Sequence, residues 1–150
     1  MKEWRFCNKC DGMFFNGRSE KGRCPAGGSH QAQGLNFDLA HDGPETGTAQ
    51  ANWRACQRCL LMFFDGYPEK GTCPGGGAHH GAPNLNFLLQ HDVREEPGFQ
   101  GAWRFCHKCF ALFFDGYPTK GVCASGGGHE AQGYMFVLPT FPRPQRIDDG

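Results

Sequence analysis

Short apolar runs, three to six residues long and rich in aromatic side chains, alternate along the chain with glycine-rich polar turns. Several of these runs are bounded by Asn-Gly or Asp-Gly pairs, which are the strongest short-range signal for a β-hairpin. Helical periodicity is absent, and 23 glycines disfavour helices. The pattern predicts an all-β protein. In its first copy we expect four strands, near residues 4–7, 12–15, 21–24 and 35–39.

The pattern occurs three times with a nearly fixed period. Cys7, Cys56 and Cys106 are 49 and 50 residues apart, and each stands in the same order of features. That order is Trp-Arg-x-Cys, an apolar run, a Gly-containing turn, Lys-Gly-x-Cys, a Gly-rich loop that ends at His, and a second apolar run. A fixed period of this length indicates a repeat architecture. We expect a single domain of three repeats and a tail, with the boundaries 1–52, 53–102, 103–140 and 141–150.

Strand alternation gives the first run of each repeat two roles. Successive side chains of a strand point to opposite faces, so Trp4 and Phe6 share one face while Arg5 and Cys7 share the other. The tryptophan can therefore enter an apolar core while the cysteine faces a separate cluster.

Each repeat carries the spacing C-x2-C-x13-C-x5-H without change. Two cysteines two residues apart can both turn inward at one tight loop, and a later Cys and His can complete a tetrahedron. Three thiolates and one imidazole suit zinc, and four protein ligands leave no position for water or substrate, so the ions are expected to be structural. The sequence predicts three zinc sites, formed by Cys7, Cys10, Cys24 and His30; by Cys56, Cys59, Cys73 and His79; and by Cys106, Cys109, Cys123 and His129.

Other uses of the nine cysteines fit this spacing less well. A redox Cys-x-x-Cys dithiol does not require a further Cys and His at fixed distances in every copy. A disulfide within each Cys-x-x-Cys pair would leave one cysteine of every repeat unused. In the second site His80 competes with His79, but only His79 keeps the common spacing.

The junctions between repeats carry His-Asp and, further on, Gln at matching offsets. A flexible linker has no reason to keep such a pattern, so a continuous architecture is favoured over separate units. Three repeats of about 50 residues with four strands each resemble the β-trefoil. The Gln-x-x-Trp at each internal junction is similar to the Gln-x-Trp of ricin B-type trefoil lectins, although it is one residue longer. The resemblance implies a pseudo-threefold β-trefoil with a lectin-like function; three tandem zinc-ribbon-like modules are the competing architecture.

Charge and composition narrow the classes of function. Fifteen basic and fifteen acidic residues cancel, so no overall positive field draws nucleic acid to the chain. No apolar run approaches the roughly 18 residues of a transmembrane helix, and the first motif begins at Trp4, so neither a transmembrane segment nor a signal peptide is expected. The expected location is the cytoplasm, whether as an isolated protein or as a module of a larger one. No Ser-His-Asp set and no Cys-His pair stands outside the metal pattern, so we do not expect an enzyme.

Residues outside the strands and the metal pattern are candidates for ligand binding. The sequence FFDGYP occurs twice, and it predicts either a plain hairpin turn or a shallow pocket where a carboxylate binds sugar hydroxyls and a tyrosine stacks on the sugar. The first copy reads FFNGRS instead. The ricin-type resemblance adds the aspartates of the two junctions as sugar ligands. The candidate binding residues are Asp65, Tyr67, Asp115, Tyr117, Asp42 and Asp92.

The expected function is a non-catalytic, multivalent binding module for a glycan or a protein receptor, because repeated weak sites on one rigid body gain by avidity. The alternative is a zinc-ribbon-like adaptor for nucleic acid or protein. In favour of the alternative, each repeat carries a basic pair close to its tryptophan. These pairs are Arg5 and Lys9, Arg54 and Arg58, and Arg104 and Lys108.

Overall fold

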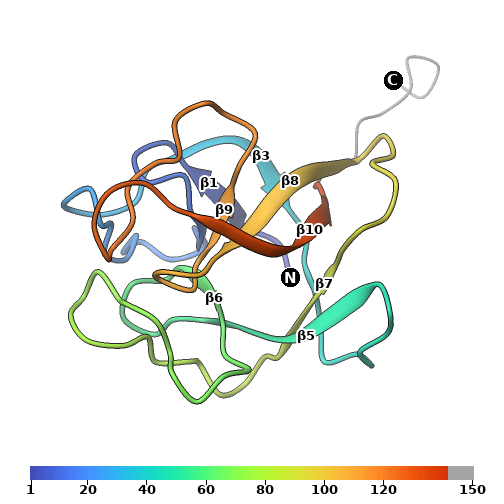
Figure 1. Cartoon of the computed structure of the whole chain (residues 1–150), viewed down its shortest axis with the longest axis horizontal. Coiled ribbons are helices and arrows are strands. Elements are labelled where there is room, and N and C mark those ends of the chain that lie inside the picture. The colour runs from blue at the N-terminus through green and yellow to red at the C-terminus, as the bar shows by residue number, and fades with distance from the viewer. Residues whose placement is uncertain (142–150) are drawn as a thin grey trace.

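The computed structural model describes residues 1–141, which form short β-strands and no helix, as the sequence predicts. The strands make three small antiparallel sheets (Figure 1). The first has the order β2-β1-β3, with β1 at Trp4–Cys7, β2 at Met13–Phe15 and β3 at Ala32–Phe37. The second has the order β4-β7-β5-β6, with β4 at Ala40–His41, β5 at Ala49–Ala55, β6 at Met62–Phe64 and β7 at Phe87–Gln90. The third has the order β10-β8-β9, with β8 at Phe99–Cys106, β9 at Leu112–Phe114 and β10 at Ala131–Pro139.

Two expectations concern the whole chain. Of the tail expected at 141–150, residues 142–150 lie outside the described residues. Among residues 1–141 there is no helix of the length and apolar character needed to cross a membrane.

A tryptophan occupies the same place in each sheet. Trp4 of β1 pairs with Phe15 of β2 on one side and with Phe37 of β3 on the other. The corresponding trios of the other sheets are Trp53, Phe64 and Phe87, and Trp103, Phe114 and Phe136. The sequence repeat is therefore also a repeat of strand register.

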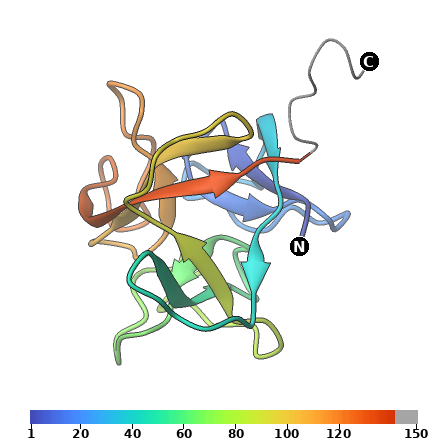
Figure 2. The ribbon, with the colours of Figure 1, turned by 90° about the vertical axis from the view of Figure 1, so that its right-hand side faces the viewer.

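The repeats contact one another in a closed cycle. Figure 2 shows the blue, green and orange-red parts of the chain arranged around a common centre. One bridge joins each repeat to the next, between Phe14 and Leu61, between Phe63 and Ala111, and between Phe113 and Gly12. A second cycle joins the segments near the repeat ends, between His41 and Phe87, between His91 and Phe136, and between Thr140 and Phe37. Every repeat therefore contacts both of the others.

Strand alternation builds two apolar layers. The first contains the three tryptophans, and Trp4 and Phe6 belong to it as predicted. The second contains all nine cysteines with Phe14, Phe63 and Phe113. Both layers draw side chains from all three repeats, so neither can form within a single repeat.

The strand expected at residues 21–24 is absent from the structure, where this segment is irregular. Gly22 has φ of +72°, and a Cβ there would lie 2.2 Å from the carbonyl oxygen of Cys59. The Arg23 amide donates to the same oxygen at 3.2 Å. The middle of the segment packs against the next repeat and forms no strand ladder within its own, which is why the prediction was wrong.

The hairpin turn also differs from the one that the Asn-Gly and Asp-Gly pairs predict. β1 and β2 are joined by the turn around Cys10, in which the Asp11 amide donates to the Cys7 carbonyl at 2.8 Å. Asp11 has φ of 68°, and Leu60 and Phe110 take the same conformation in the other repeats. Cys10 therefore lies at the hairpin tip, whereas the pairs Asn16-Gly17, Asp65-Gly66 and Asp115-Gly116 each open a longer loop.

The junction glutamines bind the core tryptophans. Gln50 Oε1 accepts a hydrogen bond from Trp53 Nε1 at 2.9 Å, and the third repeat contains the same pair. In the first repeat Met1 stands three residues before Trp4, whose buried Nε1 has no hydrogen-bond partner among the residues that the structure describes. The Gln-x-x-Trp motif is thus a core contact.

Candidate metal centres

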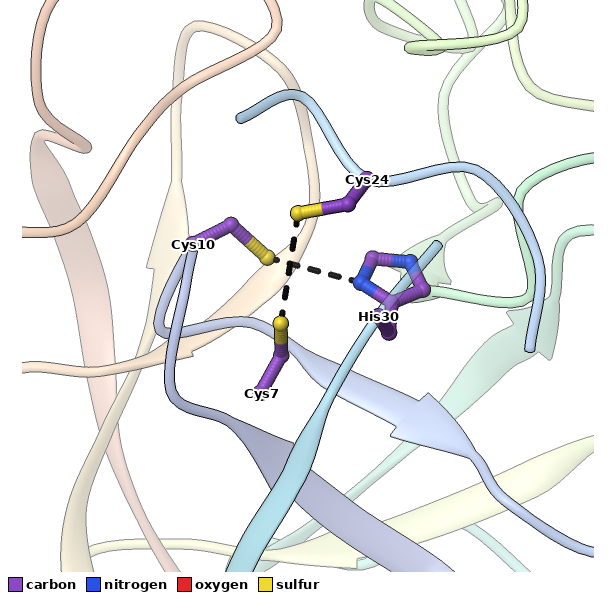
Figure 3. A group of neighbouring side chains, drawn as sticks. All are labelled: Cys7, Cys10, Cys24 and His30. Atoms are coloured by element: carbon purple, nitrogen blue, oxygen red, sulfur yellow. Dashed lines mark hydrogen bonds between the residues drawn. The ribbon is translucent and has the colours of Figure 1, made fainter. Parts of the chain in front are cut away.

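The first centre gathers four side chains from three parts of one repeat. Cys7 ends β1, Cys10 lies at the hairpin tip, Cys24 follows the long loop and His30 precedes β3. Their side chains converge on one point (Figure 3). All four are buried, and their ligand atoms lie within 4.8 Å of one another. The sequence-predicted set is therefore brought together as a group that could hold a metal ion.

The second and third centres repeat this geometry. The Sγ atoms of the first and third cysteine are 3.9, 3.8 and 3.8 Å apart in the three repeats. The second cysteine Sγ lies 3.6, 3.5 and 3.6 Å from the histidine Nδ1. In the second centre the group contains His79 and not the neighbouring His80, which is exposed.

Tight backbone turns present the sulfur atoms. The Cys24 amide donates to the Gly28 carbonyl at 2.8 Å, and Gly27 and Gly28 have φ of +104° and +66°, which suit glycine. The amides of Ala26 and Gln31 point at the sulfurs of Cys24 and Cys7, each at 3.4 Å. Such N–H groups stabilise thiolate charge and hold each sulfur in place.

Each histidine also bonds to the next repeat. His30 Nε2 lies 2.9 Å from the Cys59 carbonyl oxygen, and since a carbonyl only accepts, Nε2 carries the proton. This leaves Nδ1 facing the sulfurs. Phe14 stacks on the His30 ring with centroids 4.7 Å apart, which fixes the ring orientation. The same bonds run from His79 to the Cys109 carbonyl and from His129 to the Cys10 carbonyl, each at 2.9 Å.

These three bonds form a cycle that includes a ligand from every centre, which we name the His–carbonyl ring. Its acceptors belong to Cys10, Cys59 and Cys109, the second cysteine of each pair. A glycine of the preceding repeat packs against each acceptor, so closely that a Cβ would lie 2.2–2.3 Å from the oxygen. These glycines are Gly22, Gly71 and Gly121. Another repeat therefore supplies the acceptor for each ligand histidine, whereas the stacking phenylalanine belongs to the same repeat as the histidine.

Two cysteines and the histidine of the first centre have strongly shifted pKa values. Hydrogen bonds from Cys10 and Cys24 hold the pKa of Cys7 far below its usual range. Hydrogen bonds with Cys24 and Cys7, together with burial, raise the pKa of Cys10. Burial lowers the pKa of His30, but hydrogen bonds with the thiolates of Cys24 and Cys7 outweigh it and raise this pKa to about 9. These closely packed groups interact strongly, and a divalent cation bound by them would displace their protons.

Basic side chains beside the centres bind carbonyl groups and not thiolates. Lys9 Nζ donates to the carbonyls of Gly27 and Ser29 at 2.6 and 2.7 Å, and Lys108 makes the equivalent pair. Arg58 binds two carbonyls of the corresponding loop in the second repeat. These cations hold the Gly-rich loop that carries the third cysteine to the histidine.

Asp65 and Tyr67 lie in a loop closed by a lysine. Lys70 Nζ donates to the backbone carbonyls of both residues, at 2.9 and 2.6 Å, and lies 2.8 Å from the Asp65 carboxylate. Arg54 Nε lies 3.4 Å from the same carboxylate. The equivalent residues of the third repeat are Asp115, Tyr117, Lys120 and Arg104. Both carboxylates are engaged within the protein, whereas the tyrosines are 49% and 46% exposed.

Asp42 and Asp92 each bind the preceding histidine. His41 Nδ1 lies 2.9 Å from an Asp42 oxygen, a hydrogen bond that lowers the pKa of Asp42, and His91 with Asp92 has the same geometry. His41 is exposed, whereas His91 is buried and stacked on Tyr134 with ring centroids 3.6 Å apart. Asp92 therefore helps to hold the Tyr134 ring through His91. Sequence analysis did not single out Tyr134.

Sequence analysis also missed the outer contacts of the centres. The stacking phenylalanine was visible only as part of the apolar run MFF or LFF, and the carbonyl acceptors leave no residue-type signal. Comparison with family models, curated proteins and solved structures yielded no match for the chain.

Proposed function

We propose that this chain is a non-catalytic, multivalent binding module whose fold is stabilised by three structural zinc ions. The observation that carries the proposal is the geometry of the three buried Cys3His groups. A tetrahedral zinc ion with Zn–S bonds of about 2.3 Å and a Zn–N bond of about 2.0–2.1 Å needs S···S edges of about 3.8 Å and S···N edges of about 3.6 Å. The separations of 3.8–3.9 Å and 3.5–3.6 Å match these edges.

The donor set supports zinc and a structural role. Thiolate and imidazole ligands favour zinc over magnesium or calcium, which prefer oxygen. Four protein ligands would close the coordination sphere, and all four are buried in each group, so substrate has no approach to the ion. When bound, the ion neutralises the charge of the thiolates. It also cross-links the hairpin tip, the long loop and the segment that leads from the histidine to the next strand.

A pseudo-threefold β-trefoil is the architecture that we propose for the three repeats. Its support is the double cycle of pairings between repeats and the two shared apolar layers. Independent zinc-ribbon-like modules would require each repeat to have its own core. The zinc ions would then stabilise one common scaffold.

The scaffold suits multivalent binding of an uncharged ligand such as a neutral glycan. The half-exposed rings of Tyr67 and Tyr117 occupy equivalent places in two repeats and offer stacking surfaces. A nucleic-acid adaptor has less support, because Arg5 and Arg104 donate to main-chain carbonyls of their own repeats, at 3.0–3.1 Å, and are not free to bind phosphate.

Metal analysis of paired variants tests the zinc proposal. Protein purified without chelator is expected to contain three zinc ions, His79→Ala two, and the control His80→Ala three. Cobalt(II) titration of the wild-type protein adds a test that does not depend on the variants folding, because thiolate-to-cobalt charge transfer reports the sulfur ligands. Fewer than two zinc ions in the wild-type protein would contradict the three-site proposal.

Binding assays test the function. Neutral glycans on an array are expected to bind, and single-stranded and double-stranded oligonucleotides to bind weakly or not at all. Oligonucleotide affinity that falls steeply with salt concentration would favour the adaptor alternative instead.

A further inference from the structure

Three hollows of the same construction lie between neighbouring repeats. Aligned positions border all three, but the residues differ. The hollow between the second and third repeats has a volume of about 310 Å³ and is bordered by Tyr67, Phe105 and Tyr134. The hollow between the third and first repeats has a volume of about 100 Å³ and is bordered by Tyr117, Phe6 and Leu35. The hollow between the first and second repeats has a volume of about 190 Å³ and is bordered by Arg18, Ala55 and Leu85. Only the first of these, which we name the aromatic hollow, has three aromatic residues at these positions.

The aromatic walls of this hollow are rigid and partly exposed. One face of Tyr134 stacks on the buried His91 ring, with centroids 3.6 Å apart and planes at 10°. Asp92 holds His91 through its Nδ1. Tyr134 is nevertheless 44% exposed, so its ring is fixed while part of it meets solvent. On the opposite side Tyr67 packs edge-on against Phe105, with centroids 6.4 Å apart. The hollow is therefore formed before any ligand arrives, which lowers the entropic cost of binding.

The polar groups of the hollow are uncharged amides. Gln50 and Gln132 border it, together with the backbone of Gly133. Gln50 Oε1 accepts from Trp53, while within the described part of the chain its side-chain nitrogen has no hydrogen-bond partner. Among residues 1–141, no charged side chain borders the hollow. Amides both donate and accept hydrogen bonds, as do hydroxyl groups, and a site without charge favours neither an anion nor a cation.

We infer that the aromatic hollow binds one ring of a neutral saccharide, with Tyr67 and Tyr134 against its C–H faces and the amides of Gln50 and Gln132 bonded to its hydroxyls. This inference rests on the proposed binding function and gives it a place and a ligand class. It locates the sugar away from the Asp65 carboxylate, which Lys70 and Arg54 already neutralise. A volume near 300 Å³ is at the small end of ligand sites, as one ring requires.

The surroundings admit a longer chain. Beyond Tyr67, Phe105 and Gln132 the hollow continues into a broader cleft of about 830 Å³, which these three residues also border. That cleft is also bordered by the charged residues Glu69, Lys70 and Lys108. A saccharide with one ring in the hollow would therefore extend its next rings over this cleft.

The decisive variant is Tyr134→Leu, because leucine is the residue at the aligned positions 35 and 85 and the fold already accommodates it there. The probes are neutral oligosaccharides on an array, and each one that binds is titrated by calorimetry. We expect Tyr134→Leu and Gln132→Ala each to weaken binding about tenfold or more, with the zinc content and melting temperature close to those of the wild type. The control Leu35→Ala, in the hollow between the third and first repeats, is expected to leave the affinity unchanged.

The outcomes separate this inference from the wider function. Equal saccharide affinity of wild-type protein and Tyr134→Leu would overturn the aromatic hollow while the binding function stood. Binding only of sulfated or sialylated glycans, or of protein ligands, would overturn the neutral-saccharide class and leave the binding module. An array on which no glycan binds would overturn the inference together with the glycan version of the proposed function.

Discussion

The contact between a glycine and the carbonyl of the next repeat can be tested with two glycines of one repeat. Gly71 and Gly77 have φ of +70° and +66°, so alanine suffers the same backbone strain at either position. They differ in their surroundings. An added Cβ at Gly71 would lie 2.3 Å from the Cys109 carbonyl oxygen and 2.7 Å from Phe110 Cβ, whereas at Gly77 it would meet no atom of residues 1–141 within 4 Å.

The magnitude follows from this difference. A left-handed conformation costs a non-glycine residue about 1–2 kcal/mol, and this is the whole effect expected for Gly77→Ala. Gly71→Ala adds an overlap of about 1 Å with main-chain atoms, which can be relieved only by separating the second and third repeats. Overpacking of this kind costs about 3 kcal/mol. For a chain of this size the extra loss corresponds to a melting temperature about 6–12 °C below that of Gly77→Ala.

Thermal denaturation of the zinc-loaded variants, followed by circular dichroism, measures this difference. A second readout is the rate at which a chromogenic chelator removes zinc. That rate should rise for Gly71→Ala, because the displaced Cys109 carbonyl is the acceptor for His79. Equal melting temperatures and equal zinc release for the two variants would refute a tight interlock between the repeats.

Three further predictions concern other contacts. Removal of zinc by a strong chelator should abolish the β-sheet circular dichroism signal, and zinc but not magnesium should restore it; an unchanged spectrum of the metal-stripped protein would contradict a structural role. Gln100→Met, which copies Met1 of the first repeat, should lower the free energy of unfolding by about 1–2 kcal/mol in urea titration, because the buried indole N–H of Trp103 loses its acceptor; no loss would show that this bond contributes nothing. Lys70→Met should cost about 1–2 kcal/mol by the same assay, because two carbonyls and the Asp65 carboxylate lose their cation, whereas the control Glu69→Met should change little.

The sequence was sufficient to predict what depends on spacing within one repeat. The invariant ligand spacing identified all twelve residues of the Cys3His groups, and alternation in β1 correctly separated Trp4 from Cys7. The cluster forms inside a repeat, so its members could be found from the pattern alone.

Features that depend on which repeat lies next to which could not be predicted in this way. Gly22 takes a left-handed conformation to pass Cys59, a residue of another repeat, and this contact removed the expected strand at 21–24. The aromatic hollow likewise combines Tyr67 with Tyr134 across a boundary. The sequence held a signal for the hollow, since the aromatic residue Tyr134 stands where the other two copies have leucine. That Tyr67 lies beside it could not be known without the fold.

The His–carbonyl ring has a consequence for the order of assembly. Its last bond joins His129 to Cys10, 119 residues apart, so the Cys10 carbonyl, in the first of the three repeats, receives its hydrogen bond only after His129 of the third repeat has been made. During synthesis the first centre can gather its own four ligands before the Cys10 carbonyl has its partner. The bonds from His30 to Cys59 and from His79 to Cys109 need only residues made earlier, so the bond from His129 to Cys10 is the one that closes the ring.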